Sequence, residues 1–196
     1  MFDTVINKNL MFLQKYGIKM NTEDDKDVYR YGLKIIYFYI IDIVIIFSVS
    51  ALFNRFYESA LIVFIFGLFQ IFGGGYHANT KLKCSSLMIM GTIAGNILIN
   101  IIVNYKIFMI ISVFILPIAL LILGPVKNKR HPVSKKTYKR SKFIARIITI
   151  ICILTTLLLL ALNRNIGAAV IISTLYLYAI SLTAIKIKNR VQINNR

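Results

Sequence analysis

Two residues that could carry out covalent chemistry, His77 and Cys84, lie close together in one short polar connection. Residues 72–84 read Phe-Gly-Gly-Gly-Tyr-His-Ala-Asn-Thr-Lys-Leu-Lys-Cys, and Cys84 is the only cysteine outside an apolar run. A thiol becomes a strong nucleophile when a base takes its proton or when positive potential stabilises the thiolate. The pair therefore predicts Cys84 as a nucleophile with His77 as its base.

The spacing of the pair sets a condition on the backbone. Seven residues of continuous helix would separate the two side chains by roughly 10 Å, which is too far for a hydrogen bond. The connection must therefore fold back, and residues 73–75, three glycines, supply the backbone freedom for this. A new helix beginning at Asn79 or Thr80 would place Cys84 near the positive end of that helix dipole.

The same segment also allows interpretations without catalysis. A glycine-rich turn can carry a histidine and a cysteine at a membrane interface without catalysis. One histidine and one cysteine fall short of the usual four zinc ligands, and His131 lies in a distant basic segment. Cys152 lies inside an apolar run, where a cysteine is usually a small buried hydrophobe. We therefore predict no metal and no cofactor.

The elements that position this segment are predicted to be membrane-spanning helices. Apolar residues make up 58% of the 196-residue chain, above the roughly 45–50% of soluble domains. A spanning helix needs about 20 apolar residues. Six segments approach that length: 33–53, 59–75, 85–103, 107–123, 143–162 and 166–185. The predicted class is an all-α, polytopic membrane protein with one domain over 1–196 and six transmembrane helices within 33–185.

The basic residues predict how these helices are oriented, because connections rich in Lys and Arg stay in the cytoplasm. With the amino terminus inside, the outer connections carry only Arg55, Lys106 and Arg164 of 24 Lys and Arg residues. Both termini and the Cys84 connection are then cytoplasmic. A re-entrant second segment would move the basic amino terminus outside, which the charge rule disfavours. The net charge of +17 is assigned to anionic lipids, since no nucleic-acid module fits such short basic segments.

Residues 1–20 are predicted to form an amphipathic helix on the inner leaflet. Apolar residues recur there at helical three- and four-residue steps, and Gly17 is a plausible stop. A second helix is expected to begin near Asn21 or Thr22, since Thr22 and Asp25 have the spacing of a capping box.

The segment 127–142 is predicted to be a basic cytoplasmic loop with eight Lys and Arg residues. It can set the topology by facing anionic lipids. It can also dock an acidic partner or peptide, for which Lys135, Lys136, Lys139 and Arg140 are the candidates.

The glycine, histidine and cysteine pattern is specific in this membrane context. The segment Gly74-Gly75-Tyr76-His77-Ala78, followed by Cys84, resembles the accessory gene regulator B (AgrB) family of membrane peptidases. Chain length, the amphipathic amino terminus, six spans and the basic loop agree with that family along essentially the whole chain.

The resemblance implies roles for individual residues. It implies His77 as the base and Cys84 as the nucleophile. The sequence singles out no third catalytic residue: Gln70, Asn79, Ser85 and Ser86 all lie near enough to orient His77 or the oxyanion, and Gly74 and Gly75 are further supporting candidates. The family commonly has an arginine seven residues before the histidine, where this chain has Gln70. An amide can donate a hydrogen bond to an oxyanion, but it supplies no charge.

The resemblance also implies a substrate, an AgrD-like precursor peptide of Gram-positive quorum sensing, processed at the cell membrane. Cys84 would release the carboxyl-terminal tail of the precursor and hold the rest as a thioester, which a cysteine of the peptide converts into a thiolactone.

A noncatalytic transporter or peptide exporter is the alternative. It rests on polar residues within the predicted spans: Asp42, Asn96 and Asn100. Each also has a structural interpretation as an interhelical pairing. Gly91 and Gly95 form a GxxxG pattern that suits either internal packing or a homodimer.

Overall fold

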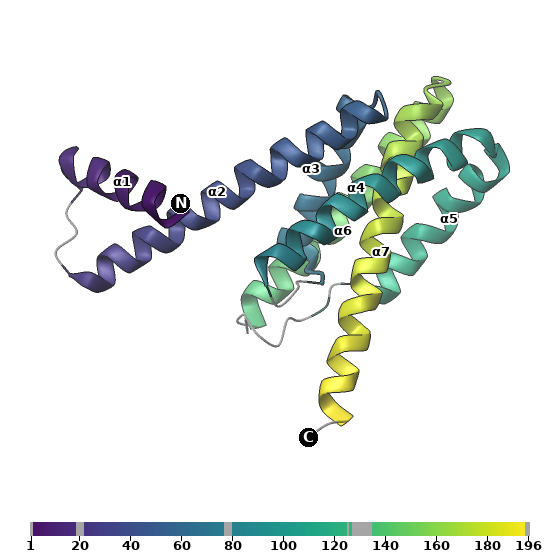
Figure 1. Cartoon of the computed structure of the whole chain (residues 1–196). Coiled ribbons are helices and arrows are strands. Elements are labelled where there is room, and N and C mark those ends of the chain that lie inside the picture. Colours follow the sequence, from purple (N-terminus) through teal and green to yellow (C-terminus); the bar gives the residue numbers. More distant parts are fainter. Residues whose placement is uncertain (1, 19–21, 77–79, 125, 127–134, 195–196) are drawn as a thin grey trace. The chain divides into compact units, whose positions relative to one another are not determined.

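The computed structural model describes residues 2–18, 22–76, 80–124, 126 and 135–194, which form seven α-helices and no β-strand (Figure 1). The helices are α1 (Phe2–Lys15), α2 (Glu23–Leu52), α3 (Phe56–Gly73), α4 (Lys81–Asn104), α5 (Lys106–Leu123), α6 (Lys135–Ala161) and α7 (Asn165–Asn194). The predicted all-α class is confirmed.

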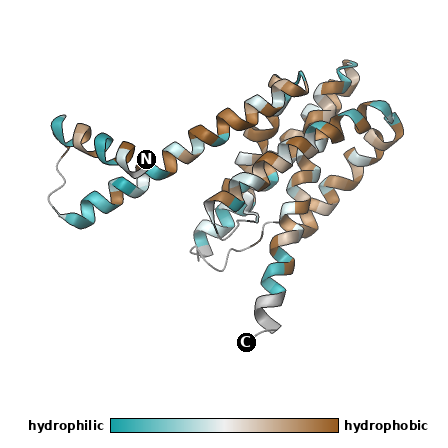
Figure 2. Ribbon diagram, in the orientation of Figure 1, coloured by the Kyte–Doolittle hydropathy of each residue, from teal (hydrophilic) through white to brown (hydrophobic). Residues whose placement is uncertain are grey.

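Six of these helices, α2 to α7, are long and apolar enough to cross a membrane. Figure 2 shows apolar residues along their central parts and hydrophilic residues at the amino-terminal part of α2. Large apolar side chains such as Ile107, Phe114 and Ile118 of α5 are exposed, as expected for helix faces that contact lipid. Pro117 lies inside α5 without ending it. These features indicate a multi-pass membrane protein.

The first 45 residues form a compact unit of their own. One face of α1 is buried, with Ile6 fully enclosed and packed together with Leu10 against Leu33 and Tyr37 of α2. The helix ends before Gly17, whose positive φ of 89° suits glycine. The predicted amphipathic helix and its glycine stop are confirmed, while its place on the inner leaflet stays a prediction.

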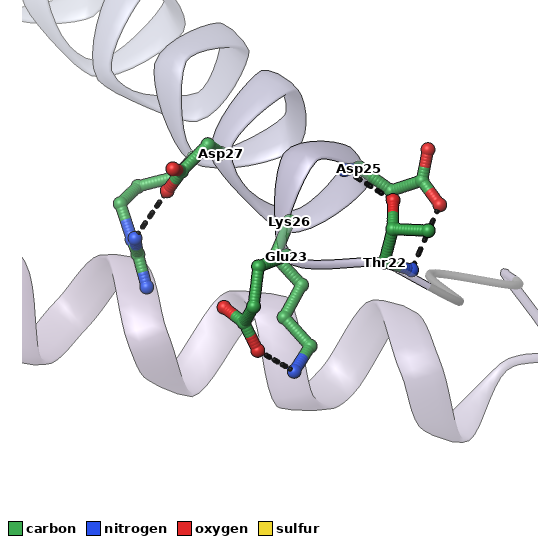
Figure 3. Close-up of polar contacts among 6 residues, drawn as sticks. Thr22, Glu23, Asp25, Lys26 and Asp27 are labelled. Carbon is green, nitrogen blue, oxygen red and sulfur yellow. Dashed lines mark hydrogen bonds and ion pairs between the residues drawn. The ribbon is translucent and has the colours of Figure 1, made fainter.

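The beginning of α2 shows the predicted capping box (Figure 3). The Thr22 amide donates to the Asp25 carboxylate, and the Asp25 amide donates to the Thr22 hydroxyl, each at 3.1 Å. Such a reciprocal pair satisfies two backbone donors that a helix start leaves free. Because nothing interrupts the helix after this cap, its polar first turns and the first predicted span form one continuous helix.

Residues 46–196 form the second unit, and α7 is its central helix. Helix α7 packs against α3, α4, α5 and α6. In the most apolar stretch of α7, 61% of the residues are buried, whereas the buried share in the corresponding stretches of those four helices is 22–28%. Small residues allow this close approach: Ala168, Ala169, Ser173 and Thr174 are all fully buried. Because α7 contacts all four of these helices, it can position the connections between them.

Helix α6 begins at Lys135, eight residues before the predicted span. The last part of the segment predicted as a basic loop is therefore helical, while residues 127–134 lie outside the described residues. Hydropathy marks only the apolar part of a helix, whereas lysine and arginine are themselves good helix formers. Apolarity alone therefore places the start of the helix later in the chain than it lies.

Candidate active site

Cys84 lies in the first turn of α4. The Thr80 side chain accepts a hydrogen bond from the Lys83 amide at 3.4 Å, and the Cys84 amide donates to the Thr80 carbonyl at 3.1 Å. Thr80 is thus the residue that caps the helix. The half-buried Cys84 is followed by the half-buried Ser85. An anion at the start of a helix is stabilised by the partial positive charge there, and Lys83 adds a full positive charge in the same turn.

His77 and Asn79, which the sequence assigns to the same site, lie outside the described residues. The chain is described up to Tyr76 on one side and from Thr80 on the other. The pairing of His77 with Cys84 therefore stays a prediction.

The glycines that end α3 are enclosed by neighbouring elements. A Cβ atom on Gly73 would overlap the Tyr178 hydroxyl, and one on Gly74 would lie 2.9 Å from the Val126 carbonyl oxygen. Gly74 also has a positive φ of 70°, which side chains rarely tolerate. Glycine is therefore needed here both for a close approach and for a turn. The predicted fold-back of His77 onto Cys84 itself lies outside the described residues.

Gln70 and the next glycine lie against Ser181 of α7. The Ser181 hydroxyl oxygen accepts hydrogen bonds from the Tyr76 amide at 2.9 Å and from the Gln70 side-chain amide at 3.2 Å. The side-chain oxygen of Gln70, Oε1, is buried and has no hydrogen-bond partner among the described residues. A Cβ atom on Gly75 would lie 2.6 Å from this oxygen. The Gln70 side chain therefore lies between the glycine segment and Ser181 in its contacts, bonding to Ser181 and meeting Gly75.

Two more side chains of α7 hold the same segment. The Tyr178 ring is buried and stacks on Phe69, with ring centroids 4.4 Å apart. The Lys188 ammonium lies 4.6 Å from the centre of the Tyr76 ring, a cation–π geometry. Tyr178, Ser181 and Lys188 follow one another at steps of three and seven residues, so they share one face of α7.

Sequence reasoning missed this face of α7. A serine within an apolar span usually bonds to its own helix backbone, so Ser181 carried no signal by itself. The available signal was the helical spacing of Tyr178, Ser181 and Lys188, whose side chains all end in a polar group.

The candidate substrate-binding residues lie at the start of α6. The Lys136, Lys139 and Arg140 side chains are exposed. Lys135 is the first residue of the helix, but its side chain lies outside the described residues.

Two of the three polar residues that suggested transport, Asn96 and Asn100, make side-chain hydrogen bonds near the start of α3. Asn96, which is fully buried, donates to the Ser59 hydroxyl at 2.8 Å. The Asn100 side-chain oxygen accepts from the Arg55 guanidinium at 2.7 Å. The first bond joins α3 to α4, and the second joins α4 to the residue that precedes α3. The Asn96 side-chain oxygen is buried without a partner among the described residues. Asp42 is buried in α2.

The two glycines of the GxxxG pattern differ in their surroundings. A Cβ atom on Gly95 would lie 3.0 Å from Ile62 and 3.2 Å from Leu177, so this glycine serves packing within the chain. Gly91 has nothing within 4 Å of the corresponding position. Half of the pattern is thus used internally, and a homodimer stays a prediction.

Comparison with known proteins places these residues in a family context. The profile of the family described as Accessory gene regulator B matches residues 6–185. The chain is also 24% identical over 178 residues to a Clostridium perfringens protein named as AgrB-like, covering 86% of this chain and 83% of that protein. No solved structure matches the chain.

Proposed function

Because the chain belongs to the accessory gene regulator B family, we propose that it is a membrane-embedded cysteine endopeptidase acting on an AgrD-like precursor peptide. Family membership supports a role in the agr quorum-sensing system and, in general, an AgrD-type substrate. The observation that carries the enzymatic proposal is the half-buried Cys84 in the first turn of α4. His77 belongs to the connection that leads directly into that turn.

The first chemical step breaks a peptide bond of the precursor. His77 takes the thiol proton of Cys84, and the sulfur attacks the carbonyl carbon that precedes the carboxyl-terminal tail. The resulting oxyanion needs hydrogen-bond donors, for which the helix start, Ser85 and Asn79 are the candidates. The carbon–nitrogen bond then breaks, and the tail leaves as an amine that takes the proton from His77. A thioester on Cys84 remains.

The second step closes a ring. The thiolate of a cysteine within the peptide attacks the thioester carbonyl, displaces Cys84 and forms a thiolactone. One thioester replaces another, so the step is nearly isoenergetic and depends mainly on positioning.

The proposed site lies at the cytoplasmic face of the cell membrane, with both termini inside. The argument is the distribution of charge, since this orientation leaves only three of 24 basic residues in outer connections. Anionic lipids and the membrane-bound precursor would both be accessible from that face.

We further propose that the basic start of α6 holds an acidic tail of the precursor. The exposed Lys136, Lys139 and Arg140 follow the first helical residue, Lys135. Neutralising all four residues should weaken processing, chiefly through a higher KM, while membrane insertion stays normal. The measurement is precursor processing at several salt concentrations, since exposed charges are screened by salt. Processing that does not change would refute this assignment.

The peptidase proposal is tested by co-expressing the protein with its precursor and following tail release by mass spectrometry. Cys84→Ser and His77→Ala should each abolish release. Cys152→Ser is the matched control, because that cysteine is buried within α6 and should be dispensable. Full cleavage by Cys84→Ser would rule the proposal out. Under the transporter alternative, Asp42→Asn would be the damaging change instead.

A further inference from the structure

We infer that Ser181 of α7 is a positioning residue for the reaction, because it fixes the backbone from which the proposed base, His77, extends. The inference rests on the proposed function. Among the described residues, the Ser181 hydroxyl bonds to Tyr76 and Gln70 and not to Cys84, so it would act through the segment that it holds.

The hydroxyl of Ser181 joins two parts of this segment. It accepts from the Tyr76 amide at 2.9 Å and from the Gln70 side chain at 3.2 Å. Tyr76 immediately precedes His77, and Gln70 lies one helical turn before the end of α3. One oxygen atom on α7 therefore joins the last turn of α3 to the residue before the base.

The segment needs such an external anchor. Fixing the backbone of three successive glycines costs a large amount of conformational entropy. Helix α3 ends at Gly73, so helical hydrogen bonds do not continue through the glycines that follow. The order must then come from tertiary contacts. Those described are the Ser181 bonds, the Tyr178 hydroxyl beside Gly73 and the Lys188 ammonium over the Tyr76 ring. Among them, only the Ser181 bonds act on the backbone of the residue before His77.

The location of Ser181 separates positioning from general stability. Helix α7 is held by four neighbouring helices, and replacing serine by alanine removes one oxygen atom without opening a large cavity. A misplacement of about 1 Å can cost on the order of 100-fold in rate. Loss of this anchor should therefore affect kcat far more than folding.

The test compares Ser181→Ala with Ser181→Thr and with Thr183→Ala. Thr183 is an exposed residue of the same helix whose hydroxyl donates to the Ala179 carbonyl at 2.8 Å. In Ser181→Ala, kcat for tail release should fall roughly 10- to 100-fold while KM for the precursor is unchanged. Ser181→Thr retains the hydroxyl and should recover most of the rate, and Thr183→Ala should match the wild type.

A second readout follows the anchor directly. Hydrogen exchange of the Tyr76 amide, measured by NMR on ¹⁵N-tyrosine-labelled protein in micelles, should accelerate in Ser181→Ala but not in Thr183→Ala. If kcat stays at the wild-type level while Cys84→Ser is inactive, the inference is overturned and the proposed peptidase stands, whatever the Tyr76 exchange rate. If Cys84→Ser still cleaves, the peptidase proposal and the inference both fail.

Discussion

The two ends of the α3–α7 bundle are built in different ways. At one end the connections are short: residues 53–55, the single residue Tyr105, and residues 162–164. At the other end, residues 74–80 and 124–134 connect the helices. The proposed chemistry belongs to the end with the long connections.

The short end is closed by local hydrogen bonds. Asn54 and Asn163 both have positive φ, at 52° and 54°. The following amides, of Arg55 and Arg164, bond back five residues at 3.1 and 2.8 Å. This is the Schellman geometry that satisfies the free carbonyls of a helix end. The glycine-rich connection is instead held by side chains of α7. We therefore expect substitutions at the short end to alter stability alone, and substitutions at the other end to alter catalysis.

The largest effect is expected from Gly73→Ala. The added methyl group would overlap the hydroxyl of Tyr178, which cannot easily move because its ring is buried and stacked on Phe69. Overpacking of this kind costs about 1–3 kcal/mol, and tail release should be lost as α3 shifts from α7. The measurements are thermal unfolding in micelles and the processing assay.

Gly67→Ala is the control on the same helix, because nothing lies within 4 Å of its added methyl group. It should retain both stability and activity. A Gly73→Ala protein with wild-type stability and processing would contradict the close packing of α3 on α7.

A smaller effect, confined to activity, is expected from Gly75→Ala. The added methyl group meets only the end of the flexible Gln70 side chain, which can swing away and lose its bond to Ser181. One hydrogen bond is worth about 1 kcal/mol, so the processing rate should fall up to about tenfold. Adding Gln70→Ala removes the clash, and the double variant should lose less than the sum of the single losses. Additive losses would show that Gly75 and Gln70 act separately.

The smallest effect on activity is expected from Asn163→Ala at the short end, where only stability should change. Alanine in the left-handed region costs roughly 1–2 kcal/mol, whereas Asn163→Gly should be nearly neutral. The activity of the folded fraction should stay unchanged in both variants, as measured by processing per amount of folded protein. A loss of specific activity as large as that of Gly75→Ala would remove the distinction between the two ends.

Several features were predictable because their causes are local in the chain. The Thr22–Asp25 cap, the Gly17 stop and the Thr80 start of α4 depend on residues at most three or four positions apart. The early start of α6 at Lys135 was missed because a hydropathy pattern does not register a polar helical turn. Ser181 was missed because it lies 111 residues from Gln70, and nothing local distinguishes it from other serines in spans.

Six apolar helices, the family pattern through Cys84 and the charge distribution that predicts orientation could all be recognised without a structure. Each follows from composition or from short-range spacing. The central place of α7, and the contacts of its Tyr178, Ser181 and Lys188 with the glycine segment, became visible only in the folded chain. The reason is physical: a central and a peripheral span are equally apolar in a bilayer, so their places are set by packing of small residues and by interhelical hydrogen bonds.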